Sequence, residues 1–253
     1  MKSHVLILAA GTGSRRKSDT PKVLHAVAGA PMLHLVMSTA KRLDPEQMHL
    51  VLGHGIETIR DTLAVQWSST NIVRQAKQLG TGHAVNIALE HVPNDGISLV
   101  LYGDVPLITV DTLKHCVAIA DAGELGIVTA NMSDPAQLGR ILRNDTDSIE
   151  AIVEFKDATL QQRAIHEINS GILAAPTHLL RGWLARVQRN YQQGEYYLTD
   201  VVADFVAQGE TLPTLEADDL AEVQGVNSLV ELSIVRAVMQ ERILLEHLTN
   251  GVL

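Results

Sequence analysis

Apolar and polar positions alternate in two rhythms along the first half of the chain, and each rhythm predicts one kind of element. Short, almost wholly apolar runs predict strands at 4–10, 48–52, 71–74, 98–102 and 126–132. Between them, apolar residues recur at helical spacing and predict helices at roughly 31–43, 55–64, 81–91 and 109–122. Because the strands are apolar on both faces, the alternation favours an α/β fold whose mostly parallel sheet is covered by helices on both sides.

The rhythm changes from about residue 139. The stretch "GRILRNDTDSIEAIVEF" predicts an antiparallel hairpin, in which a turn containing Asn and Asp joins two strands. A further strand, "EINSGILAA", follows, and then helices near 177–190 and 198–208. The chain has no internal repeat, low-complexity tract or long linker, so we expect one α/β domain with an inserted antiparallel portion.

A long helix is predicted at the C-terminal end of the chain. Ser228-x-x-Glu231 is a capping-box pattern, typical of a helix start. The apolar residues that recur at helical spacing after it are Leu229, Leu232, Val235, Met239 and Ile243. These signals predict a helix from about 228 to 248. We therefore divide the chain into a main domain, residues 1–227, and a helical segment, residues 228–253.

The composition narrows the classes of partner. The chain has 253 residues, of which 46% are hydrophobic and 3% aromatic, and a formal net charge of −9. This acidity and the scarcity of aromatic side chains for base stacking argue against nucleic-acid binding. No apolar run approaches the ~20 residues of a membrane span, and Val5–Ala10 is shorter than the roughly 7–15 residues of a signal-peptide core. We interpret the chain as a cytoplasmic protein with small-molecule partners and no membrane contact.

The cysteine and histidine residues of the sequence give little support for a thiol-based or zinc-based function. The single cysteine, Cys116, excludes an internal disulfide and a Cys-rich zinc site, and its helical surroundings favour a buried hydrophobic role. The 11 histidines show no His-Glu-x-x-His spacing.

The first glycine-rich stretch concentrates positive charge. Residues 5–25 read "VLILAAGTGSRRKSDTPKVLH", and the first 22 positions hold five of the chain's 20 Lys and Arg residues. Backbone N–H groups of a glycine loop after a strand can bind phosphate oxygens. The loop from Gly11 matches neither the dinucleotide-binding nor the Walker pattern, because Arg16 stands where each requires glycine. A glycine loop supplemented by Arg15 and Lys22 remains, which suits a triphosphate; a solvated basic loop is the alternative.

A second stretch ends a predicted strand with a carboxylate. "SLVLYGDVPL", residues 98–107, places Asp104 directly after four apolar residues and Tyr102-Gly103. Ligands of open α/β sheets bind at the carboxyl ends of the strands, and Mg²⁺ uses one or two carboxylates together with phosphate oxygens. Asp104 is therefore a candidate magnesium ligand, while capping of a turn before Pro106 is an equally suitable role.

A third stretch offers neutral polar groups. "QAKQLGTGHA", residues 75–84, places two glycines and a threonine before a predicted helix, where N–H groups point outward. The side-chain amides of Gln75 and Gln78 carry donors and acceptors that can recognise the edge of a nucleobase. An ordinary helix-start loop is the alternative interpretation.

Taken in this order, the stretches resemble the sugar nucleotidyltransferases. The motifs that carry the resemblance span positions 8 to 228: "LAAGTGSR", "PKVLH", "QLGTGHA", "YGDVPL", "GRI", "VEFKDA", "EINSGI", "GEYYLTD" and "EVQGVNS". The set is most similar to the N-terminal uridyltransferase domain of the bacterial bifunctional N-acetylglucosamine-1-phosphate uridyltransferase/glucosamine-1-phosphate acetyltransferases. Two positions depart from that pattern: Ser14 replaces threonine, and Arg16 replaces an apolar residue.

The resemblance implies a fold and a reaction. The fold is a Rossmann-like nucleotidyltransferase fold, with a mostly parallel mixed sheet flanked by helices, an inserted antiparallel portion and a long C-terminal helix. The reaction transfers uridylyl from UTP to N-acetylglucosamine 1-phosphate, giving UDP-N-acetylglucosamine and pyrophosphate for the synthesis of peptidoglycan and lipopolysaccharide.

The resemblance also implies a role for individual residues. Arg15 and Lys22 would be catalytic and bind the triphosphate. The residues expected around the nucleotide are Ala9, Ala10, Gly11, Gly13, Gln75, Gly80 and Thr81. The residues expected around the sugar or at the border of the pocket are Tyr102, Gly103, Gly139, Glu154, Asn169 and Tyr197. Asp104 and Asn227 would hold Mg²⁺, and Asn227 would also contact substrate.

The final expectations concern the end of the chain and the competing functions. No hexapeptide repeat follows Ser228, so we expect uridyltransferase activity without acetyl transfer. We also expect a monomer or weak dimer, with a trimer for a full-length enzyme. One alternative is a nucleotidyltransferase for another sugar or base, such as thymidylyl transfer to glucose 1-phosphate. Another is a catalytically silent domain that binds sugar nucleotides for regulation. The retention of Arg15, Lys22, Asp104 and Asn227 argues against silence.

Overall fold

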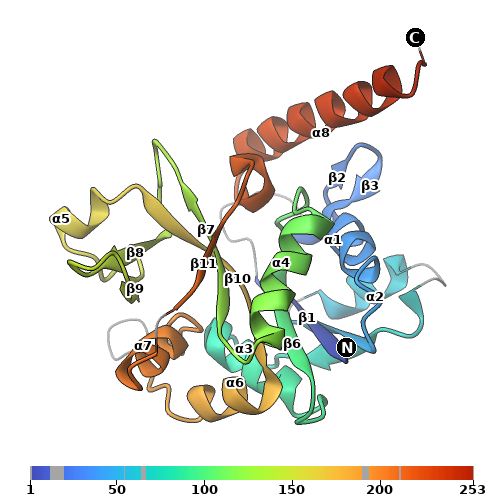
Figure 1. Ribbon diagram of the computed structural model, residues 1–253. Coiled ribbons are helices and arrows are strands. Elements are labelled where there is room, and N and C mark those ends of the chain that lie inside the picture. The colour runs from blue at the N-terminus through green and yellow to red at the C-terminus, as the bar shows by residue number, and fades with distance from the viewer. Residues whose placement is uncertain are drawn as a thin grey trace.

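One large mixed sheet forms the centre of the molecule (Figure 1). The computed structural model describes residues 2–11, 20–53, 55–63, 67–189, 194–210 and 212–252. Within them, seven strands run side by side in the order β11 (Thr214–Glu216), β7 (Gly126–Asn131), β10 (Glu167–Pro176), β6 (Ile97–Tyr102), β1 (Ser3–Ala9), β4 (Gln47–Leu52) and β5 (Asn71–Arg74). Strands β6, β1, β4 and β5 are parallel to one another, as is β11 to β7. Strand β10 is antiparallel to both β6 and β7.

Helices cover both faces of this sheet because its strands are apolar on both sides. All seven residues of β1 are buried, and the apolar ones divide between two hydrophobic cores. On one face, Val5 and Ile7 pack in the core that holds α1 (Met32–Lys41), α2 (Ile56–Thr62) and α4 (Val110–Asp121). On the other face, Leu6 and Leu8 pack in the core that holds α3 (Thr81–Leu89), α6 (Thr177–Leu184) and α7 (Asp200–Ala207). The predicted α/β fold is therefore confirmed.

The predicted hairpin is present, and its attachment to the sheet adds detail that the sequence did not indicate. Strands β8 (Gly139–Arg143) and β9 (Ile149–Val153) pair antiparallel, and β8 also pairs with the start of β10. The pattern missed the shortest elements: β11, the β2–β3 ribbon (Ala26–Val27 and Ala30–Pro31) and the one-turn helix α5 (Leu160–Arg163). Elements of two to four residues are too short to show a period.

A buried arginine fixes the loop in front of β8. Arg140 is 2% exposed, and its guanidinium donates to the backbone carbonyls of Pro135, Leu138, Ala136 and Arg163. A buried charge is tolerated when its hydrogen bonds are satisfied in this way. The loop that leads into Gly139 is thereby held in one conformation.

The long C-terminal helix, α8 (Leu229–Thr249), begins where the capping box predicted. The Ser228 hydroxyl accepts from the Glu231 N–H at 3.2 Å, and the Glu231 carboxylate accepts from the Asn227 N–H at 2.6 Å. In the first half of α8, Leu232 and Val235 are buried against the main domain. Further along, Arg242 donates to the Leu107 carbonyl at 2.7 Å. Leu229, which belongs to the apolar positions at helical spacing, is 67% exposed. The helix continues away from the domain (Figure 1).

The described helices include none with both the length and the apolar character needed to span a membrane.

A buried carboxylate connects α4 to the segment before α8. Glu222, in the short 3-10 helix η3 (Leu220–Val223), is 5% exposed. It accepts hydrogen bonds from the hydroxyls of Thr112 at 2.6 Å and Thr109 at 2.9 Å. Both threonines lie at the start of α4, so this carboxylate holds the two segments together.

Glu222→Ala is expected to lower the free energy of unfolding by about 2 kcal/mol, because two hydroxyl donors lose a charged acceptor in the interior. Denaturant unfolding followed by circular dichroism measures this change. Glu124→Ala, at an exposed position, is the control and should stay within about 0.5 kcal/mol of the parent. Equal stability of the two variants would contradict the role given to Glu222.

Candidate active site

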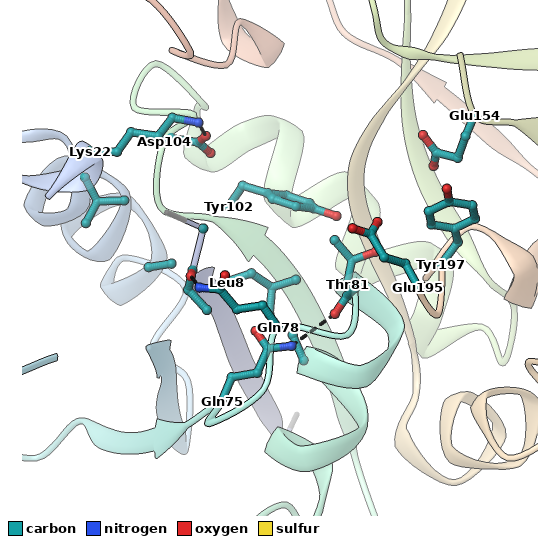
Figure 2. A pocket seen from close by; sticks show the side chains of 16 residues that line it. Leu8, Lys22, Gln75, Gln78, Thr81, Tyr102, Asp104, Glu154, Glu195 and Tyr197 are labelled. Atoms are coloured by element: carbon teal, nitrogen blue, oxygen red, sulfur yellow. Dashed lines mark hydrogen bonds and ion pairs between the residues drawn. The ribbon is translucent and has the colours of Figure 1, made fainter. Parts of the chain in front are cut away.

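The ends of β1 and β6 open into a cleft at the carboxyl edge of the sheet (Figure 2). The chain leaves β1 through Ala10 and Gly11 and leaves β6 through Gly103 and Asp104, and the Gly103 N–H donates to the Leu8 carbonyl at 2.9 Å. A cavity of about 400 Å³ lies here. The expected site residues that line it are Ala9, Ala10, Gly11, Lys22, Gln75, Gly80, Thr81, Tyr102, Asp104, Glu154 and Tyr197. Gly13 and Arg15 lie outside the described residues.

A cation and two oxygen ligands meet at one end of this cleft. Lys22 lies in the 3-10 helix η1 (Lys22–Leu24), and its ammonium pairs with the Asp104 carboxylate. The same ammonium donates to Asn227 Oδ1 at 2.7 Å. The Val226 N–H donates to the Asp104 carbonyl at 3.0 Å, which holds Asn227 beside Asp104. Two residues 123 positions apart thus direct oxygens at one positive charge.

This arrangement fits the metal that the sequence predicted. Carboxylate and amide oxygens are ligands that Mg²⁺ accepts, and a site with few protein ligands leaves positions for phosphate and water. The described residues contain no cluster of three or more His, Cys, Asp or Glu side chains able to hold a metal. A second cavity, of about 670 Å³, extends from Gly11 and Lys22 to Asn227 and continues the cleft.

The side of the cleft that holds Gly80 and Thr81, expected around the nucleotide, is built by a close backbone contact between two distant loops. The Tyr196 N–H donates to the Leu79 carbonyl at 2.8 Å, and the Leu198 N–H donates to Thr81 Oγ1 at 3.1 Å. Gly80, just before α3, has a φ of +99°, and a Cβ there would lie 2.8 Å from the Tyr196 nitrogen. Glycine is therefore required at this position. The contact explains how "QLGTGHA" and "GEYYLTD" form one wall.

The two glutamines of that wall have different surroundings. Gln75 is 4% exposed, and its side-chain nitrogen donates to the Gly80 carbonyl at 3.1 Å. Gln78 donates instead to the Ala10 carbonyl, in the loop that follows β1. The amide nitrogen of Gln78 is thus used to hold the loop, whereas both glutamines had been candidates for reading a base. Gly53, which the sequence did not single out, leaves the space for this bond, since its Cβ would lie 2.9 Å from Gln78 Nε2.

The opposite side of the cleft brings together the residues expected around a sugar. Asn169 of β10 pairs in register with Gly139 of β8, and the Glu154 carboxylate lies beside Gly139, 3.6 Å from where its Cβ would be. The Thr199 hydroxyl donates to Glu154 Oε1 at 3.0 Å. Burial raises the pKa of Glu154, and the Thr199 bond opposes that rise. Gly139 and Asn169 lie behind Glu154 and are not among the residues that line the first cavity.

Tyr102 forms the floor between these two sides, and burial raises the pKa of its phenol. Gly171 of β10 lies against the ring, with a φ of +84°; its Cβ would lie 2.5 Å from Tyr102 Cε2. The register of β10 shifts between Asn169 and Leu173, where Gly171 lies. The sequence analysis missed this residue, although a glycine inside a predicted strand signals a bulge or a close approach.

Comparisons with known proteins identify the family of this chain. Residues 5–203 match the model of the MobA-like NTP transferase domain. The chain belongs to this family. It is 48% identical over 231 residues to "Bifunctional protein GlmU" of Pseudomonas aeruginosa, covering 91% of this chain and 50% of that protein. The same-named protein of Azotobacter vinelandii is 46% identical over 252 residues, covering 100% of this chain and 55% of that protein. The resemblance seen in the motifs is confirmed, and the chain spans about half the length of these curated relatives.

Solved structures of this class show the same fold. A UDP-glucose pyrophosphorylase complexed with UDP-glucose superposes with a TM-score of 0.77 at 16% identity, covering 96% of this chain and 100% of that one. A putative glucose-1-phosphate thymidylyltransferase from Bacillus anthracis gives a TM-score of 0.72 at 18% identity, covering 93% and 94%. At these identities the likeness establishes the architecture, and the expected nucleotidyltransferase fold is confirmed.

Gly171→Ala is expected to destabilise the protein by about 1–3 kcal/mol more than Gly123→Ala, because overpacking against Tyr102 adds to the strain of a positive φ. Gly123 is the matched control: its φ is +94°, and a Cβ there would meet nothing within 4 Å. Denaturant unfolding of both variants isolates the steric contribution. An equal loss of unfolding free energy in the two variants would show that the Tyr102 ring moves aside without cost.

Proposed function

We propose that this chain transfers the uridylyl group of UTP to N-acetylglucosamine 1-phosphate, releasing pyrophosphate and giving UDP-N-acetylglucosamine for cell-wall precursor synthesis. The observation that carries the proposal is a single cleft with a cation end at Lys22, Asp104 and Asn227, a nucleobase wall at Gln75 and a polar wall at Glu154. It occurs in a chain 48% identical over 231 residues to "Bifunctional protein GlmU".

Charge repulsion between two polyanionic reactants is the obstacle that the residues must overcome. Lys22 and, by its place in the motif, Arg15 would neutralise the triphosphate. A phosphate oxygen of the sugar phosphate then attacks the α-phosphorus in line. The new P–O bond forms as the bond to the β-phosphate breaks, and pyrophosphate leaves with the electron pair. The protein supplies alignment and charge, so no side-chain nucleophile is required.

Each wall of the cleft has its own part in this alignment. The backbone at Ala9, Ala10 and Gly11 would approach the nucleoside and phosphates, with Gln75, Gly80 and Thr81 at the base. On the sugar side, the proposed contacts are Gly139, Glu154, Asn169 and Tyr197, with Tyr102 and Gly103 between the two walls. Asp104 and Asn227 would hold Mg²⁺, which when bound supplies positive charge at the reacting phosphates.

The proposed partners are these two small molecules alone. The cytoplasmic location and the monomeric or weakly dimeric state expected from the sequence stay part of the proposal. So does the division into a catalytic domain, residues 1–227, and a helical segment, residues 228–253.

Pyrophosphate release from UTP, Mg²⁺ and N-acetylglucosamine 1-phosphate tests the proposal directly. Asp104→Asn is expected to lower turnover by a factor on the order of 10² or more, because metal placement is lost. The protein should still fold, with an unfolding midpoint lowered only by the weaker pairing with Lys22. Asp121→Asn, at an exposed position on α4, is the control of identical chemistry. A near-normal rate of Asp104→Asn at limiting Mg²⁺ would remove Asp104 from the metal site.

The same assay separates the alternatives. Faster pyrophosphate release with dTTP and glucose 1-phosphate would favour a thymidylyltransferase. Binding of UDP-N-acetylglucosamine without any turnover would favour the regulatory domain.

The two adjacent arginines of the glycine loop give a further prediction from sequence alone, since both lie outside the described residues. Arg15→Ala is expected to cost far more activity than Arg16→Ala. A preorganised cation that faces the transition state contributes about 2–4 kcal/mol, whereas a solvated arginine contributes little. The ratio of kcat/KM between the two variants measures the difference. A larger loss for Arg16→Ala would reverse the assignment.

A further inference from the structure

The orientation of the Gln75 side chain is set by two neighbours. The Gln75 N–H donates to the Leu52 carbonyl at 2.7 Å, which fixes its backbone at the end of β5. Its side-chain nitrogen lies 3.1 Å from the Gly80 carbonyl and 3.0 Å from Nδ1 of His83. Figure 2 shows the bond from the Gln75 side chain to the Gly80 carbonyl across the base of the cleft. The remaining freedom of this side chain is rotation of its amide by 180°, which exchanges nitrogen and oxygen.

Hydrogen-bond chemistry decides between the two orientations. The Gly80 carbonyl can only accept, so the group that faces it must be the amide nitrogen. That nitrogen carries two protons, and the second one meets His83 Nδ1. Nδ1 must then be the acceptor, which places the imidazole proton on Nε2. Both amide protons are thus used inside the protein, and the oxygen Oε1 is the atom that Gln75 can offer a ligand.

A ligand base is selected by what it can donate to that oxygen. Uracil and thymine carry an N–H at position 3, which can donate to Oε1. Cytosine has an unprotonated nitrogen at position 3, whose lone pair would face the Gln75 oxygen. A buried acceptor that meets another acceptor loses its hydrogen bond, and such sites discriminate strongly between bases.

We propose that His83 is a positioning residue for base recognition: its Nδ1 holds the Gln75 amide in the orientation that accepts from the N3–H of a uracil or thymine nucleotide and disfavours cytosine. This inference rests on the proposed function for the location of the base. It assigns to the histidine of "QLGTGHA" a task that the motif comparison left open. His83 acts through Gln75 and needs no contact with the ligand itself.

Calorimetric binding of UTP and CTP to the whole chain, without sugar phosphate, tests the proposal. His83→Leu removes one of the two acceptors that hold the Gln75 amide and is expected to lower the preference for UTP over CTP about tenfold, because the Gly80 carbonyl alone then opposes rotation of the amide. His83→Asn should restore most of the preference, since its Oδ1 can accept in place of Nδ1. His115→Leu, on the exposed face of α4, controls for the loss of a histidine and should keep the parent ratio.

The result that would overturn the proposal is an unchanged UTP/CTP ratio in His83→Leu, or an equal loss of both nucleotides, which would indicate a structural role alone. A second measurement does not depend on folding of the variant. Long-range ¹H–¹⁵N spectra of the parent should show His83 with its proton on Nε2, and a proton on Nδ1 would contradict the argument.

The proposal and the proposed function can fail separately. A parent chain that prefers UTP, loses that preference on His83→Leu and releases no pyrophosphate would contradict the proposed reaction and leave the role of His83 intact. A parent that turns over UTP while His83→Leu keeps the full preference would contradict the role of His83 alone.

Discussion

The ammonium of Lys22 connects three segments that are far apart in the sequence. Lys22 follows the glycine loop after β1 in the sequence. Its ammonium pairs with Asp104 at the end of β6 and donates to Asn227 just before α8. Removing charges from water is unfavourable unless they are paired, so these three groups stabilise one another in a partly closed cleft. Because Ser228 caps α8 directly after Asn227, the start of the long helix is tied to the same ionic contact.

Saturated hydrogen bonds explain why the other polar side chains hold fixed orientations. Arg140 donates only to backbone carbonyls and fixes the approach to β8. Glu222 accepts from the two threonine hydroxyls at the start of α4. Gln75 donates both amide protons, one to Gly80 and one to His83. A buried polar group with every donor matched has one favourable orientation, which a partly matched group lacks. Arg140 and His83, which need not contact a ligand, therefore help to fix the groups around the cleft.

Periodicity and the order of the motifs were enough to predict the main strands and part of the cleft. Apolar runs located the core strands, and the strand-end rule placed Asp104 and Tyr102 at the cleft. Contacts between distant segments could not be predicted from the sequence. The antiparallel entry of β10 between β6 and β7, the bond from Gln78 to Ala10 and the packing of Gly171 on Tyr102 depend on which segments become neighbours. The glycine of "EINSGI" was visible as a break in a strand pattern, but its partner was not.

Charge is distributed unevenly along the cleft, and this distribution orients a ligand. Figure 2 shows Lys22 and Asp104 at one end and Glu154 with Tyr197 at the other. Lys22 is paired with Asp104, so a metal held by Asp104 and Asn227 would add the positive charge that attracts phosphates to this end, while a carboxylate at the far end repels them. Burial raises the pKa of Glu154, so its negative charge is less strongly favoured there than in water, and the group suits hydroxyl and amide partners. A molecule with phosphates at one end and a neutral sugar at the other therefore has one favourable direction in this site.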